Sequence, residues 1–393
     1  MPKGVTVAPL AERTAWRSFR GPSGSAEHTI TIAAPDGLSL PRQLDAIEQR
    51  YAEALQTLRL PPQSAIFRRL YVSDAANQDA LVRQSSLFGA ADDSPVAISL
   101  VQQPPLPGGK LALLAYHLES PTALVKQRVA PGHMCVDRGA LSHLWSTQLC
   151  TAAVDQPGSA ADQTRSVFNR LTGALADRGA TLADNCVRTW IYVKDVDVFY
   201  QDMVAARTAL FAQHGLTRDT HYLASTGIEG ACAHRYDVVL MDAYSIIGLA
   251  PQQVSYLNDF DRLCATKDYH VTFERGTRIA YADRAHHFIS GTASIDASGT
   301  VVHPGDVRRQ LIRALDNVAA LLRSGGADLA DMTHFIVYLR DPSDHAVVEA
   351  CFAERFPGVP RLILRGAVCR PEWLVEVEGI AIAPHDAPLL PAF

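Results

Sequence analysis

The stretch YHVTFERGTRIAYADRAHHFISGTASIDASGTVV, residues 269–302, opens the last third of the chain and decides the fold. Its runs of β-branched and aromatic residues predict strands. Apolar residues recur at helical spacing over residues 311–322, before a Ser-Gly-Gly breaker, and predict a helix. In the closing stretch PRLILRGAVCRPEWLVEVEGIAI, residues 360–382, Glu376 and Glu378 alternate with apolar residues, so both carboxylates leave the same face of one strand. We therefore predict a mixed α and β unit whose chemistry lies on its last strand.

The same order of elements recurs twice upstream. Three predicted strands end in related four-residue motifs, namely Tyr71-Val72-Ser73-Asp74, Tyr192-Val193-Lys194-Asp195 and Tyr338-Leu339-Arg340-Asp341. The intervals between them are 121 and 146 residues. Chance recurrence of strand and helix in a mixed protein is the alternative explanation. We predict an α+β chain with a loose leader (1–27), a degenerate first unit (28–135), a second unit (136–250) and a third unit (251–393).

Composition narrows the function classes. A pI near 6.3 and a net charge of -5 argue against nucleic-acid binding, which normally needs a basic surface. No apolar run approaches the ~20 residues of a membrane helix, and no signal region opens the chain. Seven scattered cysteines without a CxxC pair predict a reducing, cytoplasmic location and neither disulfides nor a zinc site.

Several short sequence motifs resemble those of a known family. Ile289-Ser290-Gly291-Thr292-Ala293, Gly326 to Asp331, Phe335 to Leu339 and Glu378-Gly379-Ile380-Ala381 resemble the RidA (YjgF-like) family. The words 224–228, 271–278 and 369–371 are similar to those of the chorismatases, a branch of that superfamily. The resemblance implies mixed sheets with helices packed on one face. It also implies that the three units form a covalent pseudo-trimer with clefts between units, and we expect this pseudo-trimer to be a monomer.

The resemblance also implies residue roles. Glu378 is expected to be the general acid, and no chemical role is expected for the neighbouring Glu376. Either Arg361 or Arg365 would bind a substrate carboxylate through a bidentate guanidinium contact, and the spacing does not choose between them. Arg188 would add a second cation to the site of Glu378, although a surface arginine stacked on tryptophan explains it too.

Further candidates are weaker. A backbone anion site, aromatic walls, a close-approach glycine and a small pocket residue are the expected roles of Tyr222, Thr226, Gly227, Tyr269, Phe273, Arg275, Gly291 and Ala367. Structural roles explain each of them as well. The place of Glu378 is expected to hold Asp242 in the second unit and no carboxylate, around Tyr116, in the first. We therefore expect a single working cleft.

The resemblance implies a chorismatase, which cleaves the enolpyruvyl ether of chorismate and releases pyruvate without a metal or organic cofactor. The ring product would be 3-hydroxybenzoate, favoured by the small Ala367, or 3,4-dihydroxycyclohexa-1,5-diene-1-carboxylate. Three alternatives stay open: a RidA-type imine or enamine deaminase, a non-catalytic ligand-binding pseudo-trimer, and a lyase that makes 4-hydroxybenzoate.

Overall fold

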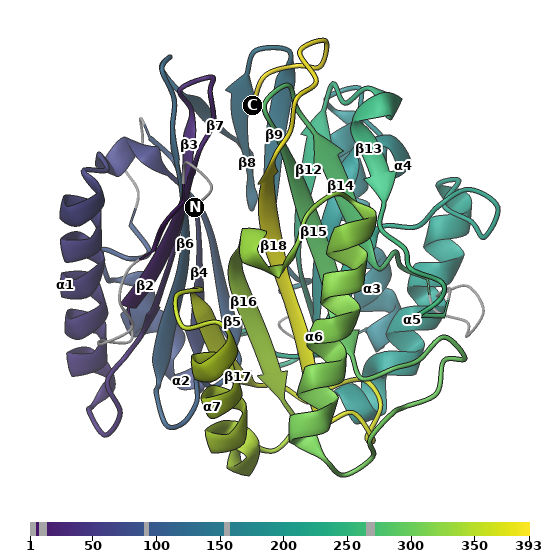
Figure 1. Ribbon diagram of the computed structural model, residues 1–393. Coiled ribbons are helices and arrows are strands. Elements are labelled where there is room, and N and C mark those ends of the chain that lie inside the picture. The colour runs from purple at the N-terminus through teal and green to yellow at the C-terminus, as the bar shows by residue number, and fades with distance from the viewer. Residues whose placement is uncertain (1–4, 8–13, 90–93, 153–157, 265–271) are drawn as a thin grey trace.

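The computed structural model describes residues 5–7, 14–89, 94–152, 158–264 and 272–393. Within these residues the chain forms three six-stranded sheets (Figure 1). The strand orders are β1-β2-β3-β6-β4-β5, β7-β8-β9-β12-β10-β11 and β13-β14-β15-β18-β16-β17. All three sheets thus share one topology, in which the last strand of a unit lies between its third and fourth strands. The predicted α+β fold of three related units is confirmed.

The elements of the three units have the following bounds. The first unit contains β1 (Val5–Val7), β2 (Thr14–Arg20), β3 (Ala26–Ala33), α1 (Leu40–Leu58), β4 (Ala65–Val72), α2 (Ala75–Arg83), β5 (Ala97–Gln102) and β6 (Leu111–Glu119). The second contains β7 (Val125–Ala130), β8 (His133–Arg138), β9 (Leu141–Leu149), α3 (Ala160–Ala176), α4 (Leu182–Asn185), β10 (Cys186–Val193), α5 (Val196–Gln213), β11 (Ala224–Glu229) and β12 (Val239–Ile247). The third contains β13 (Val254–Tyr256), β14 (Gly276–Ala280), β15 (Arg284–Ala293), α6 (Val307–Ser324), β16 (Met332–Leu339), α7 (His345–Arg355), β17 (Arg361–Arg365) and β18 (Val375–Pro384).

The unit bounds differ from the predicted ones at two places. Residues 14–20, placed in the predicted leader, form β2 and pair with β3. Strands β7 and β8 belong to the second sheet, so the first unit ends near Glu119 rather than at residue 135. Strand β7 is a largely exposed edge strand with two basic residues, Lys126 and Arg128, which explains why its sequence lacks the apolar signal of a strand.

Helix α6 shows how local sequence builds these units. The side chain of Asp306 accepts a hydrogen bond from the backbone N–H of Arg309 and caps the helix start. The predicted apolar face is buried, and the helix ends before Gly326, whose φ of 81° favours glycine. Packed on β15 and β18, α6 covers the outer face of the third sheet (Figure 1).

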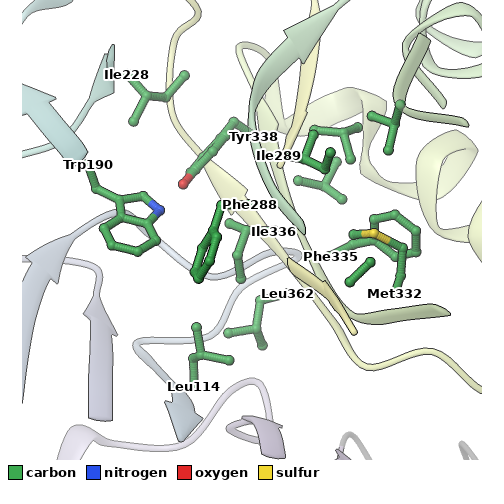
Figure 2. Close-up of a cluster of buried hydrophobic side chains, with 14 of the residues drawn as sticks. Leu114, Trp190, Ile228, Phe288, Ile289, Met332, Phe335, Ile336, Tyr338 and Leu362 are labelled. Carbon is green, nitrogen blue, oxygen red and sulfur yellow. The ribbon is translucent and has the colours of Figure 1, made fainter. Parts of the chain in front are cut away.

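The three sheets face one another in the interior while the helices lie outside (Figure 1). One apolar cluster joins all units, with Leu114 from the first, Trp190 from the second, and Phe288 and Tyr338 from the third (Figure 2). Among the described residues, no helix is long and apolar enough to cross a membrane.

A buried ion pair crosses each boundary between units. Arg69 of the first unit contacts Asp242 of the second at 2.8 Å, and Arg188 of the second contacts Glu378 of the third at 2.7 Å. Arg284 of the third unit contacts Glu27 of the first at 2.7 Å. Because a buried charge is tolerated only with its partner, these pairs fix how the units fit together.

Candidate active site

A cleft of about 170 Å³ lies between the second and third units. Helix α5 and strand β11 of the second unit form one wall, where Arg207 and Thr226 lie. The third unit supplies the other wall, with Arg275, Gly291 and Glu376 from the segment before β14, from β15 and from β18. Charged groups of both units therefore meet in one partly enclosed space.

Glu376 is the acid of this cleft. It lies on β18 between Tyr338 of β16 and Ala293 of β15, and it is 5% exposed. Burial, and then the negative charge of Glu378, raise the pKa of Glu376 to about 8, against a smaller opposing effect of Arg188 and Arg275. At neutral pH the Glu376 carboxyl therefore carries a proton that it can donate into the cleft.

Gly291 makes room for that carboxyl. A β-bulge between Ile289 and Thr292 shifts the pairing of β15 with β18 at this point. A Cβ atom on Gly291 would lie 2.1 Å from Oε1 of Glu376 and 3.1 Å from Cγ2 of Thr226. The glycine is thus required by the close approach of the Glu376 side chain.

Glu378 is hydrogen-bonded from several sides and lines a different, internal cavity. Its carboxylate accepts hydrogen bonds from Arg188 Nη2 at 2.7 Å, Trp190 Nε1 at 3.1 Å and Tyr338 OH at 2.9 Å, and from Thr226 Oγ1. A carboxylate offers about four lone-pair sites, so these donors occupy its capacity. The predicted pair of Arg188 with Glu378 is present, but it joins β10 and β11 to β18 rather than facing the Glu376 cleft.

The sheet registers show that only one of the three equivalent positions carries the cleft acid. Tyr338, Tyr192 and Tyr71 end matching strands, and they pair with Glu376, Leu240 and Ala112 respectively. A proton donor at this place is therefore found in the third unit and not at its counterparts.

The equivalents of Glu378 follow from the same registers. Ile336 pairs with Glu378, Trp190 with Asp242 and Arg69 with Leu114. Asp242 agrees with the expectation, whereas the first unit presents Leu114 there instead of Tyr116. The pairing of β4 with β6 is regular from Val72 to Phe67, so the counterpart of Glu378 in the first unit is Leu114, which is also not a carboxylate.

Comparison with known proteins agrees with this architecture. Residues 279–383 match the model of the Endoribonuclease L-PSP family (Ribonuc_L-PSP). A crystal structure of a chorismatase aligns with a TM-score of 0.62 at 20% identity, over 81% of this chain and 93% of that chain. The chain has the fold of a chorismatase.

Single-unit proteins align as well. RidA from the Antarctic bacterium Psychrobacter sp. gives a TM-score of 0.29 at 22% identity, over 33% of this chain and 99% of its own. The YjgF gene product from E. coli gives 0.27 at 23% identity, over 33% of this chain and 98% of its own.

Three arginines line the cleft, of which Arg207 and Arg275 are buried and Arg370 is partly exposed. Arg207 is 1% exposed, its Nε donates to Thr272 Oγ1 at 3.1 Å, and its Nη2 has no hydrogen-bond partner among the described residues. Burial lowers the pKa of the Arg207 guanidinium. Arg275 stacks over Phe273 at 5.3 Å and is also buried. Buried guanidinium groups beside a cavity are suited to binding carboxylates.

Five predicted site residues meet in this cleft of the chorismatase fold: Thr226, Gly227, Phe273, Arg275 and Gly291. Tyr222 and Ala367 instead pack at the core of the second unit, and Tyr269 lies outside the described residues.

The two predicted carboxylate-binding arginines lie elsewhere. Arg361 pairs with Glu349 and lines another cleft, between the first and third units. The Arg365 side chain is 49% exposed and lies 3.6 Å from Glu229. Both belong to β17, whose counterpart in the second unit, β11, forms the wall of the Glu376 cleft. The strand of this type that lines the Glu376 cleft is therefore β11 and not β17.

Arg207 is a cleft residue that the sequence analysis did not single out. Arg207 falls between Met203, Leu210 and Phe211 on the buried face of α5, and a charged residue on an apolar helical face is the signal that would have found it. Cys369 lines the cleft, and burial followed by the charge of Glu376 raises the pKa of its thiol to about 12. Cys369 is therefore a neutral thiol near pH 7 and not a thiolate nucleophile.

Proposed function

We propose that this chain is a chorismatase, which cleaves the enolpyruvyl ether of chorismate and releases pyruvate. The observation that carries the proposal is Glu376, a buried carboxyl with a pKa raised to about 8 that faces a cleft with two buried arginines. Chorismate has two carboxylates, and the two buried arginines of the cleft, Arg207 and Arg275, match that number. Glu376 supplies the proton that cleavage of the enol ether requires at neutral pH.

The first step is protonation of the enol-ether methylene by Glu376. The methylene becomes a methyl group, and the electron pair of its double bond forms the new C–H bond. The resulting oxocarbenium ion is stabilised by the carboxylate left on Glu376, because the buried cleft screens that attraction weakly. Glu378 and its donors lie behind this acid and hold β18 against β10 and β11.

The cation then has two fates. Addition of water gives a hemiketal that breaks into pyruvate and 3,4-dihydroxycyclohexa-1,5-diene-1-carboxylate. Capture by the neighbouring ring hydroxyl, followed by loss of pyruvate and aromatisation, gives 3-hydroxybenzoate. Ala367 cannot support a choice, because it lies in the core of the second unit. We propose 3-hydroxybenzoate, since the small cleft, walled by Phe273 and Trp373, leaves little space for water beside the substrate.

The test is pyruvate release from chorismate by the purified chain, with the ring product identified by mass and absorbance. Glu376→Gln keeps the shape of the neutral acid but removes its proton, so turnover is expected to fall about 10²-fold or more. Glu378→Gln is the matched variant two residues along the same strand. It is expected to lower stability through the unpaired Arg188 while retaining turnover in the folded fraction.

Full turnover by Glu376→Gln, with loss confined to folded Glu378→Gln, would return the acid to Glu378. A product dominated by the dihydrodiol would refute the 3-hydroxybenzoate assignment. Folded protein that releases no pyruvate but hydrolyses 2-aminoacrylate would make the chain an imine deaminase, and binding of chorismate without turnover would make it a ligand-binding protein.

A further inference from the structure

A second cluster of reactive side chains lies in the second unit, away from the Glu376 cleft. Cys150 directly follows β9, and Cys232 and Asp237 lie in the loop between β11 and β12. Both sulfur atoms and a carboxylate oxygen of Asp237 lie within 4.8 Å of one another, and all three residues are buried. The residues are 82 and 5 positions apart in the sequence, which is why the cysteines read as scattered.

Asp237 is 1% exposed, and its carboxyl group is held by two neighbours on the chain segment after β9. Its Oδ2 accepts the N–H of Ala152 at 2.8 Å, and its Oδ1 accepts the hydroxyl of Thr151. These bonds orient the carboxylate and leave lone pairs on both oxygens. A carboxylate oxygen oriented in this way beside two sulfur atoms is arranged as a metal ligand.

We propose that Cys150, Cys232 and Asp237 form a binding site for a thiolate-preferring divalent cation of the zinc class. Zinc bonds of about 2.3 Å to sulfur and 2.0 Å to oxygen place tetrahedral ligand atoms about 3.5 to 3.8 Å apart, inside the observed limit. The carbonyl oxygen of His234, 3.9 Å from Cys232 Sγ, offers a fourth ligand. Binding releases the two thiol protons. The two thiolates and the carboxylate then carry three negative charges against the two positive charges of the cation, so the occupied site has a net charge of -1.

The site would connect two segments that meet near the cleft. The loop that holds Cys232 continues directly from β11, which carries Thr226 and Gly227. The same loop contacts the first unit, where Gln102 N donates to Ala231 O at 2.7 Å. A cation held between β9 and this loop would therefore stabilise the end of the strand that forms the cleft wall.

Cobalt(II) tests the site, because thiolate ligation gives a charge-transfer band and tetrahedral geometry gives intense visible bands. The full-length chain, reduced with a phosphine and freed of metal by a chelator, is expected to bind one Co²⁺ with both features and to lose them on addition of Zn²⁺. Zn²⁺ is expected to raise the melting temperature. Cys150→Ser and Cys232→Ser should lose the charge-transfer band, whereas Cys351→Ser, a buried cysteine elsewhere, should keep it.

Asp237→Asn retains the shape of the site and covers the case in which a cysteine variant does not fold. It is expected to weaken Co²⁺ binding at least tenfold, since even residues behind the ligands typically contribute that much. The proposal is overturned if the wild-type chain shows no charge-transfer band, if the band persists in folded Cys232→Ser, or if mass spectrometry finds Cys150 and Cys232 joined as a disulfide in the reduced preparation. None of these readouts depends on chorismate turnover.

Discussion

The raised pKa of Glu376 predicts a pH dependence of stability that can be measured without any substrate. The rise from 4.5 to about 8, at about 1.36 kcal/mol per pH unit, corresponds to about 5 kcal/mol. Above pH 4.5 the unfolded chain releases this proton while the folded chain retains it. The free energy of unfolding of the wild type should therefore fall relative to Glu376→Gln by about 1.4 kcal/mol per pH unit, and level off above pH 8.

Urea unfolding of both proteins at several pH values between 5 and 9 gives the difference directly. Glu372→Gln, an exposed position close by on the chain, controls for the substitution itself. Curves that stay parallel across this range would show that Glu376 ionises normally in the folded chain, and the reasoning for a neutral acid at pH 7 would be refuted. A carboxylate stabilised by a cation would also give parallel curves in this range, because its pH dependence would lie below about pH 4.5.

Three further predictions follow from the same contacts. Gly291→Ala places a Cβ 2.1 Å from Oε1 of Glu376, so it should lower stability by about 1–3 kcal/mol and reduce pyruvate release more than substrate binding; unchanged kcat would contradict this. Arg188→Met leaves the Glu378 carboxylate buried without its cation and should destabilise the chain by about 3–5 kcal/mol in urea unfolding, with much of that loss recovered when Glu378→Gln is added. Arg361→Gln, in the other cleft, should leave KM for chorismate unchanged, and a large rise in KM would restore Arg361 as a substrate ligand.

The sequence predicted the fold because its signals are local. The three strand endings at Tyr71, Tyr192 and Tyr338 occupy matching places in the three sheets, and the apolar face of α6 is buried as its spacing indicated. The predicted boundary between the first and second units was wrong at β7, because an exposed edge strand has no alternation of apolar and polar residues.

The choice of the acid could not be made from the sequence. Glu376 and Glu378 lie on one face of one strand, and alternation treats them alike. What separates them comes from the neighbouring unit: β10 and β11 bring donors to Glu378, while Glu376 meets a cavity. The same holds for Arg207, whose role depends on what its helix packs against.

The three boundary ion pairs have a consequence for the evolution of this chain. Arg188 occupies the strand position that holds His334 in the third unit, since each follows a bulge at the same place. Burial lowers the pKa of His334 to about 3, so this histidine is uncharged at neutral pH. Three separate copies of the third unit, arranged as a ring, would each bury Glu378 against a neutral imidazole. The Glu378 carboxylate therefore depends on a cation that the second unit supplies and that the third unit lacks at the matching position.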